Sequence, residues 1–236
     1  MKLFRGVRQS LIKEKNLKRY LLYAVGEILL VVIGISLAFQ LSNWDDNRIK
    51  KNAENKYYES TRTQIADDSH IILEQIHFNN RYLAEFKYIN EIIENNDRRK
   101  MDTLGLLVRN LTQYSDFDRQ GNIYETMVNS GQINLLQNDK IVNGIRELEE
   151  MYIYINRMES IHYDAMMNYT GPVVASVLKY STLEIKKPDD VFTYEFQNLV
   201  ISLIQIMEEK DRTYNQARNK IEHILKSIDE ELDTKG

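Results

Sequence analysis

A long apolar run near the start of the chain limits what this sequence can fold into. Residues 20–41 read YLLYAVGEILLVVIGISLAFQL and contain one charged side chain, that of Glu27. As an α-helix this run would be about 33 Å long, and the hydrocarbon core of a bilayer is about 30 Å thick. The sequence therefore predicts a transmembrane helix over residues 20–42.

A cleaved signal peptide is the main alternative for this run, because residues 36–38 (SLA) resemble a cleavage site. The apolar part of a signal peptide is usually about 7–15 residues long, which is shorter than this run. Tyr20 and Tyr23 at one end and Trp44 at the other are also the aromatic anchors that membrane interfaces favour. These features favour a helix that stays in the membrane.

The charges beside the run predict its orientation. Residues 1–19 contain seven basic residues and one acidic residue, so their net charge is +6. The flank richer in lysine and arginine normally stays in the cytoplasm. We therefore expect residues 1–19 to form a basic, amphipathic cytoplasmic segment that contacts membrane lipid, and residues 43–236 to form a domain on the outer side.

The composition excludes some partners and chemistries. The whole chain has a net charge of −4, which leaves −9 beyond Leu41 once the basic segment and Glu27 are subtracted. An acidic domain gives no reason to expect a nucleic-acid partner. The chain has no cysteine, so disulfides, cysteine-based zinc sites and thiol catalysis are excluded.

Glu27 shares one face of the predicted helix with two small residues. At about 100° per residue, Gly34 and Ala38 each lie within about 20° of Glu27, and Tyr23 lies on the same flank. Gly34 and Ala38 form a small-xxx-small pair, which lets a neighbouring helix approach closely. A carboxylate that faces lipid is costly, so it normally turns toward protein or water.

Three roles for Glu27 follow from this position. A hydrogen bond across a helix interface would hold together a homo-oligomer or a complex with another membrane protein. A ring of Glu27 side chains in a homo-oligomer would instead line a cation or proton path. In the third case Glu27 reaches toward Lys18, Arg19 or Tyr23 at the cytoplasmic surface and has no partner helix. We favour the interface role.

The same segment resembles a known family. Residues 20–46, YLLYAVGEILLVVIGISLAFQLSNWDD, are similar to the transmembrane signature of an uncharacterised family of small bacterial single-span membrane proteins. Residues 124–152 resemble that family more weakly, and Phe39 and Ser42 depart from the leucine and asparagine that its members often have. The signature has three parts, which stand here at Tyr23–Glu27 (YAVGE), Val32–Ile35 (VIGI) and Asn43–Asp45 (NWD).

The resemblance implies a location but no activity. It implies a bacterial membrane protein that crosses once. Together with the flanking charges, this predicts the inner membrane, with the N-terminus in the cytoplasm and the C-terminal domain in the periplasm. No functional residue can be carried over from the family.

The outer domain is expected to be all-α. No proline or glycine interrupts residues 45–96, so the transmembrane helix should continue to about Asn96, with apolar residues at coiled-coil-like spacing. The chain should break at residues 95–102. Asp102 is predicted to cap a short helix that ends near Thr112.

Capping residues predict the next helices. After a loop at residues 113–122, Asn122 and Glu125 form an approximate capping box, and Gly131 is suited to end that helix in a left-handed turn. Asn138 is predicted to start a helix that runs to about Tyr180.

The helix that starts at Asn138 and one further long helix complete the predicted domain. A kink is expected at Gly171-Pro172, and a final helix should run from Asp190 to Leu232 after a linker. Each of these helices carries an apolar stripe. Burying the stripes together favours an antiparallel helical bundle.

Two Glu-x-x-His pairs are the candidates for metal ligands. Such pairs project inward in di-iron helical bundles. The pair Glu74/His77 lies opposite the predicted core columns and is expected to be solvated. The pair Glu159/His162 continues an apolar line and is expected to be a buried polar pair. A di-iron site would also need one inward glutamate from each of two further helices. The last helix places Asp211 on its apolar stripe, but its glutamates lie off that stripe. We therefore expect neither a metal site nor a cofactor.

No catalytic motif supports an enzyme, since the chain lacks a phosphate-binding glycine loop, a serine nucleophile elbow and a zinc-protease helix. We expect a membrane-anchored, non-enzymatic interaction or assembly protein. Its span would pack through Glu27, Gly34 and Ala38, and its outer domain would contact partners or self-assemble. The alternatives are a periplasmic sensor or ligand-binding subunit that signals through a partner, and an oligomeric ion-conducting assembly lined by Glu27.

Overall fold

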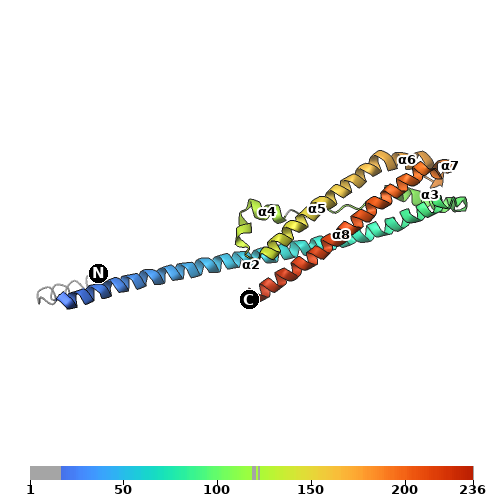
Figure 1. Ribbon diagram of the computed structural model, residues 1–236. Helices are drawn as coiled ribbons and strands as arrows, with labels where there is room; N and C mark the ends of the chain where they lie inside the picture. Colours follow the sequence, from blue (N-terminus) through green and yellow to red (C-terminus); the bar gives the residue numbers. More distant parts are fainter. Residues whose placement is uncertain (1–16, 119–120, 122, 236) are drawn as a thin grey trace. The chain divides into compact units, whose positions relative to one another are not determined.

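The structure is a computed structural model that describes residues 17–118, 121 and 123–235 (Figure 1). Among these residues the regular structure is helical apart from one pair of two-residue strands, which confirms the all-α prediction. The chain forms two compact units, Met1–Glu54 and Asn55–Gly236. Most of the basic segment predicted over residues 1–19 lies outside the described residues.

Helix α2 (Leu17–Glu94) contains all the described residues of the first unit. The predicted transmembrane run is helical without a break, although Gly26 and Gly34 lie inside it. The large apolar side chains of this run are exposed, with Leu22 at 77% and Leu41 at 67%. Among the described helices, α2 is the one that is long and apolar enough to cross a membrane.

The chain turns after Glu94, close to the predicted end of the first helix. Asn96 has a φ of 46° there. The prediction that Asp102 caps the short helix is wrong, because helical turns begin four residues earlier. The Asp97 side chain is the cap and accepts a hydrogen bond from the Arg99 N–H at 3.3 Å. Three short elements follow, η1 (Arg98–Lys100), α3 (Met101–Val108) and η2 (Arg109–Thr112).

An irregular segment at residues 113–118 leads to the next helices. Asn122, the predicted cap of α4 (Ile123–Asn129), lies outside the described residues. Gly131 has a φ of 70° after that helix, so the predicted left-handed turn is confirmed. The turn η3 (Gln132–Leu135) follows.

Helix α5 (Asp139–Ala165) begins where the sequence predicted. The side chain of Asn138 accepts a hydrogen bond from the Lys140 N–H at 3.0 Å. Asn138 also donates from Nδ2 to Glu231 Oε2 at 2.6 Å, so the cap is tied to the last helix. This confirms Asn138 as the N-cap.

The predicted irregularity at Gly171-Pro172 is a π-helical turn. The turn η4 (Met166–Thr170) joins α5 to α6 (Gly171–Val177), and the helix changes direction there (Figure 1). Pro172 has no N–H, and its ring conflicts with a regular preceding turn. The helix ends at Val177, three residues before the predicted end, because Leu178 begins a strand.

A short antiparallel strand pair replaces part of the predicted linker. It consists of β1 (Leu178–Lys179) and β2 (Glu184–Ile185), with Leu178 opposite Ile185. The short helix α7 (Pro188–Val191) contains the predicted start, Asp190, and α8 (Tyr194–Lys235) follows. Thr193 Oγ1 accepts a hydrogen bond from the Phe196 N–H at 3.3 Å and so caps α8. The long helix therefore starts at Tyr194, later than the predicted Asp190.

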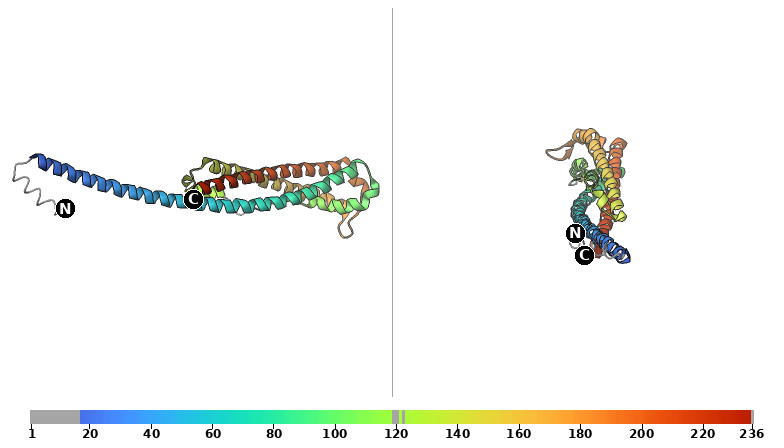
Figure 2. Two further views of the ribbon diagram at one scale, coloured as in Figure 1. Left: turned by 90° about the horizontal axis from the view of Figure 1, so that it is seen from below. Right: turned by 90° about the vertical axis from the view of Figure 1, so that its left-hand side faces the viewer.

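The second unit contains two clusters of buried apolar residues. Its long helices α5 and α8 run beside the part of α2 that follows residue 54 (Figure 2). The first core cluster joins α2 between Tyr58 and Ile76 to α5 and to α8 from Tyr214 onward. The second core cluster joins α2 beyond Leu83 to α3, α6, the strand pair, α7 and the first half of α8.

Candidate functional site

Two groups of residues are candidates for function, and each lies within one unit. The Glu27 face consists of Glu27, Gly34 and Ala38 in the first unit. The polar layer lies in the second unit and consists of Asn79, Ser115, Glu159, His162, Lys210 and Tyr214.

The Glu27 face lies on a regular helix, so its three residues share one side of α2. A Cβ added to Gly34 would meet no atom within 4 Å. Ala38 is exposed and Glu27 is half-buried. Tyr20 and Tyr23 belong to α2, but their side chains are outside the described part of the structure. The small residues of this face therefore leave room for another helix.

Trp44 marks the end of the apolar run. Its side chain is 64% exposed. The guanidinium of Arg48 lies 5.4 Å from the centre of the Trp44 ring and donates to Asp45 Oδ1 at 2.8 Å. An exposed indole beside paired charges is the combination that a membrane interface favours.

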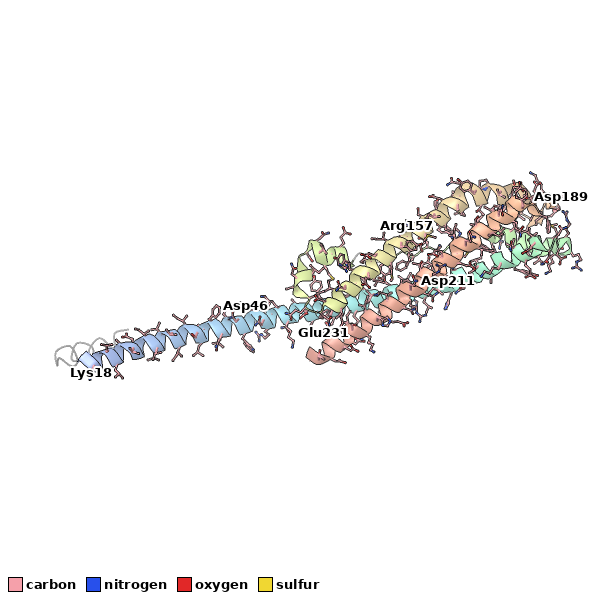
Figure 3. The ribbon with its side chains drawn as sticks, in the orientation of Figure 1. Lys18, Asp46, Arg157, Asp189, Asp211 and Glu231 are labelled. Carbon is pink, nitrogen blue, oxygen red and sulfur yellow. The ribbon has the colours of Figure 1, made fainter. Side chains whose placement is uncertain are left out.

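The polar layer lies where the two core clusters meet, and its Tyr214 ring belongs to the first. Along α8 it lies between Met207 of the second core cluster and Ala217 of the first. Each of its members is at most 4% exposed. Two residues labelled in Figure 3 mark its place on the helices. Arg157 on α5 lies two residues before Glu159, and Asp211 on α8 directly follows Lys210. The layer is closed to solvent.

Glu159 accepts two hydrogen bonds in the layer. Its Oε1 accepts from the backbone N–H of Phe117 at 2.8 Å and from the Tyr214 hydroxyl. The hydroxyls of Tyr214 and Ser115 are hydrogen-bonded at 3.1 Å. Burial raises the pKa of Glu159, although the Tyr214 hydroxyl and the charge of Lys210 act in the opposite direction. Burial and the nearby carboxylate raise the pKa of Tyr214.

Lys210 is a fully buried cation in the same layer. Its ammonium donates to the carbonyl oxygen of Ser115 at 2.6 Å. Burial lowers the pKa of Lys210 from 10.5 to about 8, while the charges of Glu159 and Asp116 favour the protonated form. Because a buried charge is costly when unpaired, the opposite charges of Lys210 and Glu159 stabilise each other.

His162 is also fully buried, at 0% exposure. Among the described residues, neither ring nitrogen has a hydrogen-bond partner. The Tyr114 ring meets the imidazole edge-on, with ring centres 6.2 Å apart. Burial, and then the charge of Lys210, lower the pKa of His162 from 6.5 to about 3. The imidazole is therefore neutral at pH 7.

The irregular segment at residues 113–118 brings backbone groups to the layer. The Asp116 N–H donates to Gln75 Oε1 on α2 at 3.1 Å. The Phe117 side chain is 2% exposed and belongs to the first core cluster. These contacts fix the segment, so the Ser115 carbonyl and the Phe117 N–H face the buried charges.

The structure gives no support for a metal site in the polar layer. Among the described residues, no three histidine, aspartate or glutamate side chains are placed to hold a metal ion. Glu159 and His162 are both buried, as predicted, but the charged group beside them is the Lys210 ammonium, which repels a cation. Glu74 and His77 are exposed, as predicted.

Lys210 and Ser115 were not predicted as site residues. Asp211 was predicted to lie on the apolar stripe of the last helix, but it is half-buried and its neighbour Lys210 is the buried residue. A signal for Lys210 was present, because it lies three residues after Met207 and four before Tyr214, which is the spacing of one helix face.

A protein-family model matches most of the chain. The model describes a family of unknown function and matches residues 27–210. The match is consistent with the uncharacterised family that residues 20–46 resemble. No curated protein and no solved structure matches the chain.

Proposed function

The chain belongs to DUF6090, a family of unknown function, and we propose that it is a membrane-anchored, non-enzymatic interaction or assembly protein. The observation that supports this is the exposed apolar surface of α2 between residues 21 and 41. Exposing apolar surface to water costs about 25 cal/mol for each Å². Lipid and a partner helix would both remove that cost.

The proposed topology follows from the charges and aromatic residues. Residues 20–42 cross the inner membrane of a bacterium once. The basic residues 1–19 lie in the cytoplasm, because lysine and arginine mark the cytoplasmic flank. Trp44 and Arg48 lie at the outer interface. The residues that follow form an antiparallel helical bundle in the periplasm.

The span is proposed to pack through the Glu27 face. The partner is a second copy of the chain or a helix of another membrane protein. Gly34 lets the two backbones approach, because a Cβ there would meet nothing within 4 Å. Glu27 then lies at the interface and forms a hydrogen bond to the partner helix, which keeps the polar side chain away from lipid. The outer domain contacts further partners or self-assembles.

Cross-linking of the full-length protein in native membranes tests this proposal. Gly34→Leu fills the face, and Glu27→Gln keeps a polar side chain but removes the carboxylate. Ser36→Leu is a matched control, because Ser36 lies about 160° away from Gly34 on the helix. We expect Gly34→Leu and Glu27→Gln to reduce the cross-linked fraction roughly threefold to tenfold, since contacts of this kind contribute about 0.6–1.5 kcal/mol.

The same experiment has a clear contrary result. If both variants keep the cross-linked species and the co-purifying partners of the wild type, the Glu27 face is not the interface. If Ser36→Leu causes the same loss as Gly34→Leu, the effect comes from a larger span and not from this face.

A periplasmic sensor subunit is the second candidate. The polar layer favours it, because an outer domain that only holds proteins together gains nothing from four buried ionisable side chains. In this role the domain would pass its state to a partner through α2. Loss of a partner's response in the full-length His162→Phe variant, with membrane localisation unchanged, would distinguish a sensor from a passive anchor.

A further inference from the structure

His162 is the member of the polar layer whose side-chain polar atoms all lack hydrogen bonds among the described residues. It is fully buried, and neither ring nitrogen has a hydrogen-bond partner among the described residues. Buried polar groups are nearly always hydrogen-bonded, so an exception calls for an explanation. The chain has four histidines, and the other three, His70, His77 and His223, are exposed.

The surroundings of His162 do not favour a positive charge. Three elements contribute ionisable groups to the polar layer, and α2 contributes the amide of Asn79, which does not titrate. The charge that acts on His162 directly is that of Lys210, and it is of the same sign as an imidazolium. The ionisable groups of the site are Lys210 and Tyr214 on α8, Tyr114 and Asp116 in the irregular segment, and Glu159 on α5.

A weak part of the helix begins one turn after His162. The Met166 N–H is shared between the carbonyls of His162 and Tyr163. The π-helical turn η4 follows, and Pro172 then lacks an N–H to donate. Single π-helical turns inside α-helices are rare and are frequent at functional sites. Both η4 and α6 contact η2, which leads directly into residues 113–118.

We propose that the polar layer is an acid-sensitive latch, in which protonation of His162 releases η4 and α6 from η2. In the packed state the neutral imidazole needs no counter-charge. A protonated imidazole would carry two unpaired N–H groups beside the Lys210 ammonium. Release at the π-helical turn lets water solvate that charge. The latch lies within the second unit, so it does not depend on whether residues 20–42 cross a membrane.

Acid favours the released state because the released imidazole binds a proton more readily than the packed one. The pKa of His162 is about 3 in the packed state, compared with 6.5 for an unperturbed imidazole. The packed state is therefore most stable above pH 6.5 and loses stability as the pH falls toward 3. The equilibrium constant for release should rise about tenfold for each pH unit in this range, or roughly 30-fold at pH 5.

Glu159 acts in the opposite direction. Its pKa is raised by burial, so its protonation at low pH favours the packed state. A variant that changes only His162 keeps this opposing effect. The difference between the wild type and that variant therefore isolates the contribution of His162.

Imidazole NMR spectra of the full-length protein in detergent micelles give the first test. The spectra are recorded between pH 7.5 and 4.5. The His162 resonances should stay those of a neutral ring until much lower pH, or until η4 and α6 open. If the His162 resonances become those of an imidazolium between pH 7.5 and 4.5 while η4 and α6 stay packed, the latch does not exist.

Hydrogen exchange gives the second test. In the wild type the amides of residues 166–177 should lose up to about 30-fold protection between pH 7.5 and pH 5, after correction for the intrinsic pH dependence of exchange, because Glu159 offsets part of the His162 effect. His162→Phe fills the same space without a titrating group and should reduce this loss to threefold or less. His77→Phe is the control, because His77 is exposed, and should behave as the wild type.

Equal pH-dependent loss in the wild type and in His162→Phe would overturn the proposal. Unchanged protection in the wild type at pH 5 would do so as well. If His162→Phe fails to fold, the smaller His162→Leu variant takes its place, and the spectra of the wild type decide the question without any variant.

Discussion

The hydroxyl of Tyr214 joins the parts of the polar layer at the scale of single residues. It donates to Glu159 on α5 and is hydrogen-bonded to Ser115 at 3.1 Å. Tyr214 and Ser115 are 0% and 1% exposed, so water cannot replace these bonds. One oxygen atom therefore links α8 to α5 and to the irregular segment.

Removing this hydroxyl should destabilise the protein strongly. We expect Tyr214→Phe to lower the free energy of unfolding by about 1–3 kcal/mol, because the buried carboxylate of Glu159 loses a donor. Tyr154→Phe is a matched control, since it also removes a hydroxyl that donates to a glutamate, Glu209, at 2.9 Å. Tyr154 is half-buried, so water replaces the lost bond and the change should be much smaller.

Urea denaturation of the full-length variants in one detergent measures both effects. Equal losses for Tyr214→Phe and Tyr154→Phe would mean that water reaches the polar layer. Such a result would also remove the physical basis for the altered pKa of Lys210, since that shift comes from burial.

Lys210 and Ser115 show which parts of the site could be predicted at this scale. The burial of Lys210 follows from its spacing to Met207 and Tyr214 on one helix face. Its hydrogen bond to Ser115 does not, because Ser115 lies 95 residues away in a segment without periodicity. Helical spacing reveals which side chains point inward, but it carries no information about an irregular segment that crosses the core.

At the scale of secondary-structure elements, the strand pair is held against α3 by a close backbone contact. A Cβ added to Gly105 would lie 2.1 Å from the carbonyl oxygen of Leu183. Leu183 itself has a φ of 55° in the turn between the two strands. Gly105 is needed here for its lack of a side chain, because α3 and the turn touch through their backbones.

Gly105→Ala should therefore be destabilising. We expect a loss of about 1–3 kcal/mol in the free energy of unfolding, because a backbone atom must move to make room. Gly144→Ala is the matched comparison on α5, where the added Cβ would lie 2.9 Å from Ile224 Cγ1. A side chain yields more easily than backbone, and alanine is favoured over glycine in a helix by about 1 kcal/mol, so the two effects nearly cancel.

Thermal unfolding followed by circular dichroism distinguishes these two glycines. The Gly105→Ala variant should melt at a lower temperature than the Gly144→Ala variant. A Gly105→Ala variant as stable as the wild type would show that the strand pair moves away from α3 at little cost.

Element boundaries were predictable where a local signal sets them. Asn138 caps α5 with its own side chain, and Gly131 ends α4 with its own positive φ. Both could therefore be identified from the sequence alone. The strand pair was not predicted, since two-residue strands are too short to show an alternating pattern. The cap at Asp102 was assigned wrongly because several polar residues stand in the break, and local pattern does not choose between them.

At the scale of the whole chain, the apolar residues divide into two sets with different surroundings. Every member of the two core clusters lies at Tyr57 or beyond it, within the second unit. The exposed apolar side chains of the predicted transmembrane run lie in the first unit. The second unit therefore contains its own core.

This division predicts the behaviour of a truncated chain. A protein made of residues 45–236 should be soluble without detergent, helical and cooperatively folded. Its free energy of unfolding should lie within about 1 kcal/mol of the value for the full chain, because the residues removed contribute nothing to either core cluster. Ile72→Asp in the truncated chain is the control for this assay, since Ile72 is 0% exposed and a buried unpaired charge should unfold it.

Circular dichroism, size-exclusion chromatography and urea denaturation measure these properties. Aggregation of the truncated chain, or loss of its helices, would mean that residues before 45 support the second unit and that their exposed apolar surface serves folding as well as anchoring. A full chain that stays soluble and monodisperse without detergent would contradict the membrane anchor itself. The two results are separate, because the first concerns the core clusters and the second concerns the apolar surface of residues 21–41.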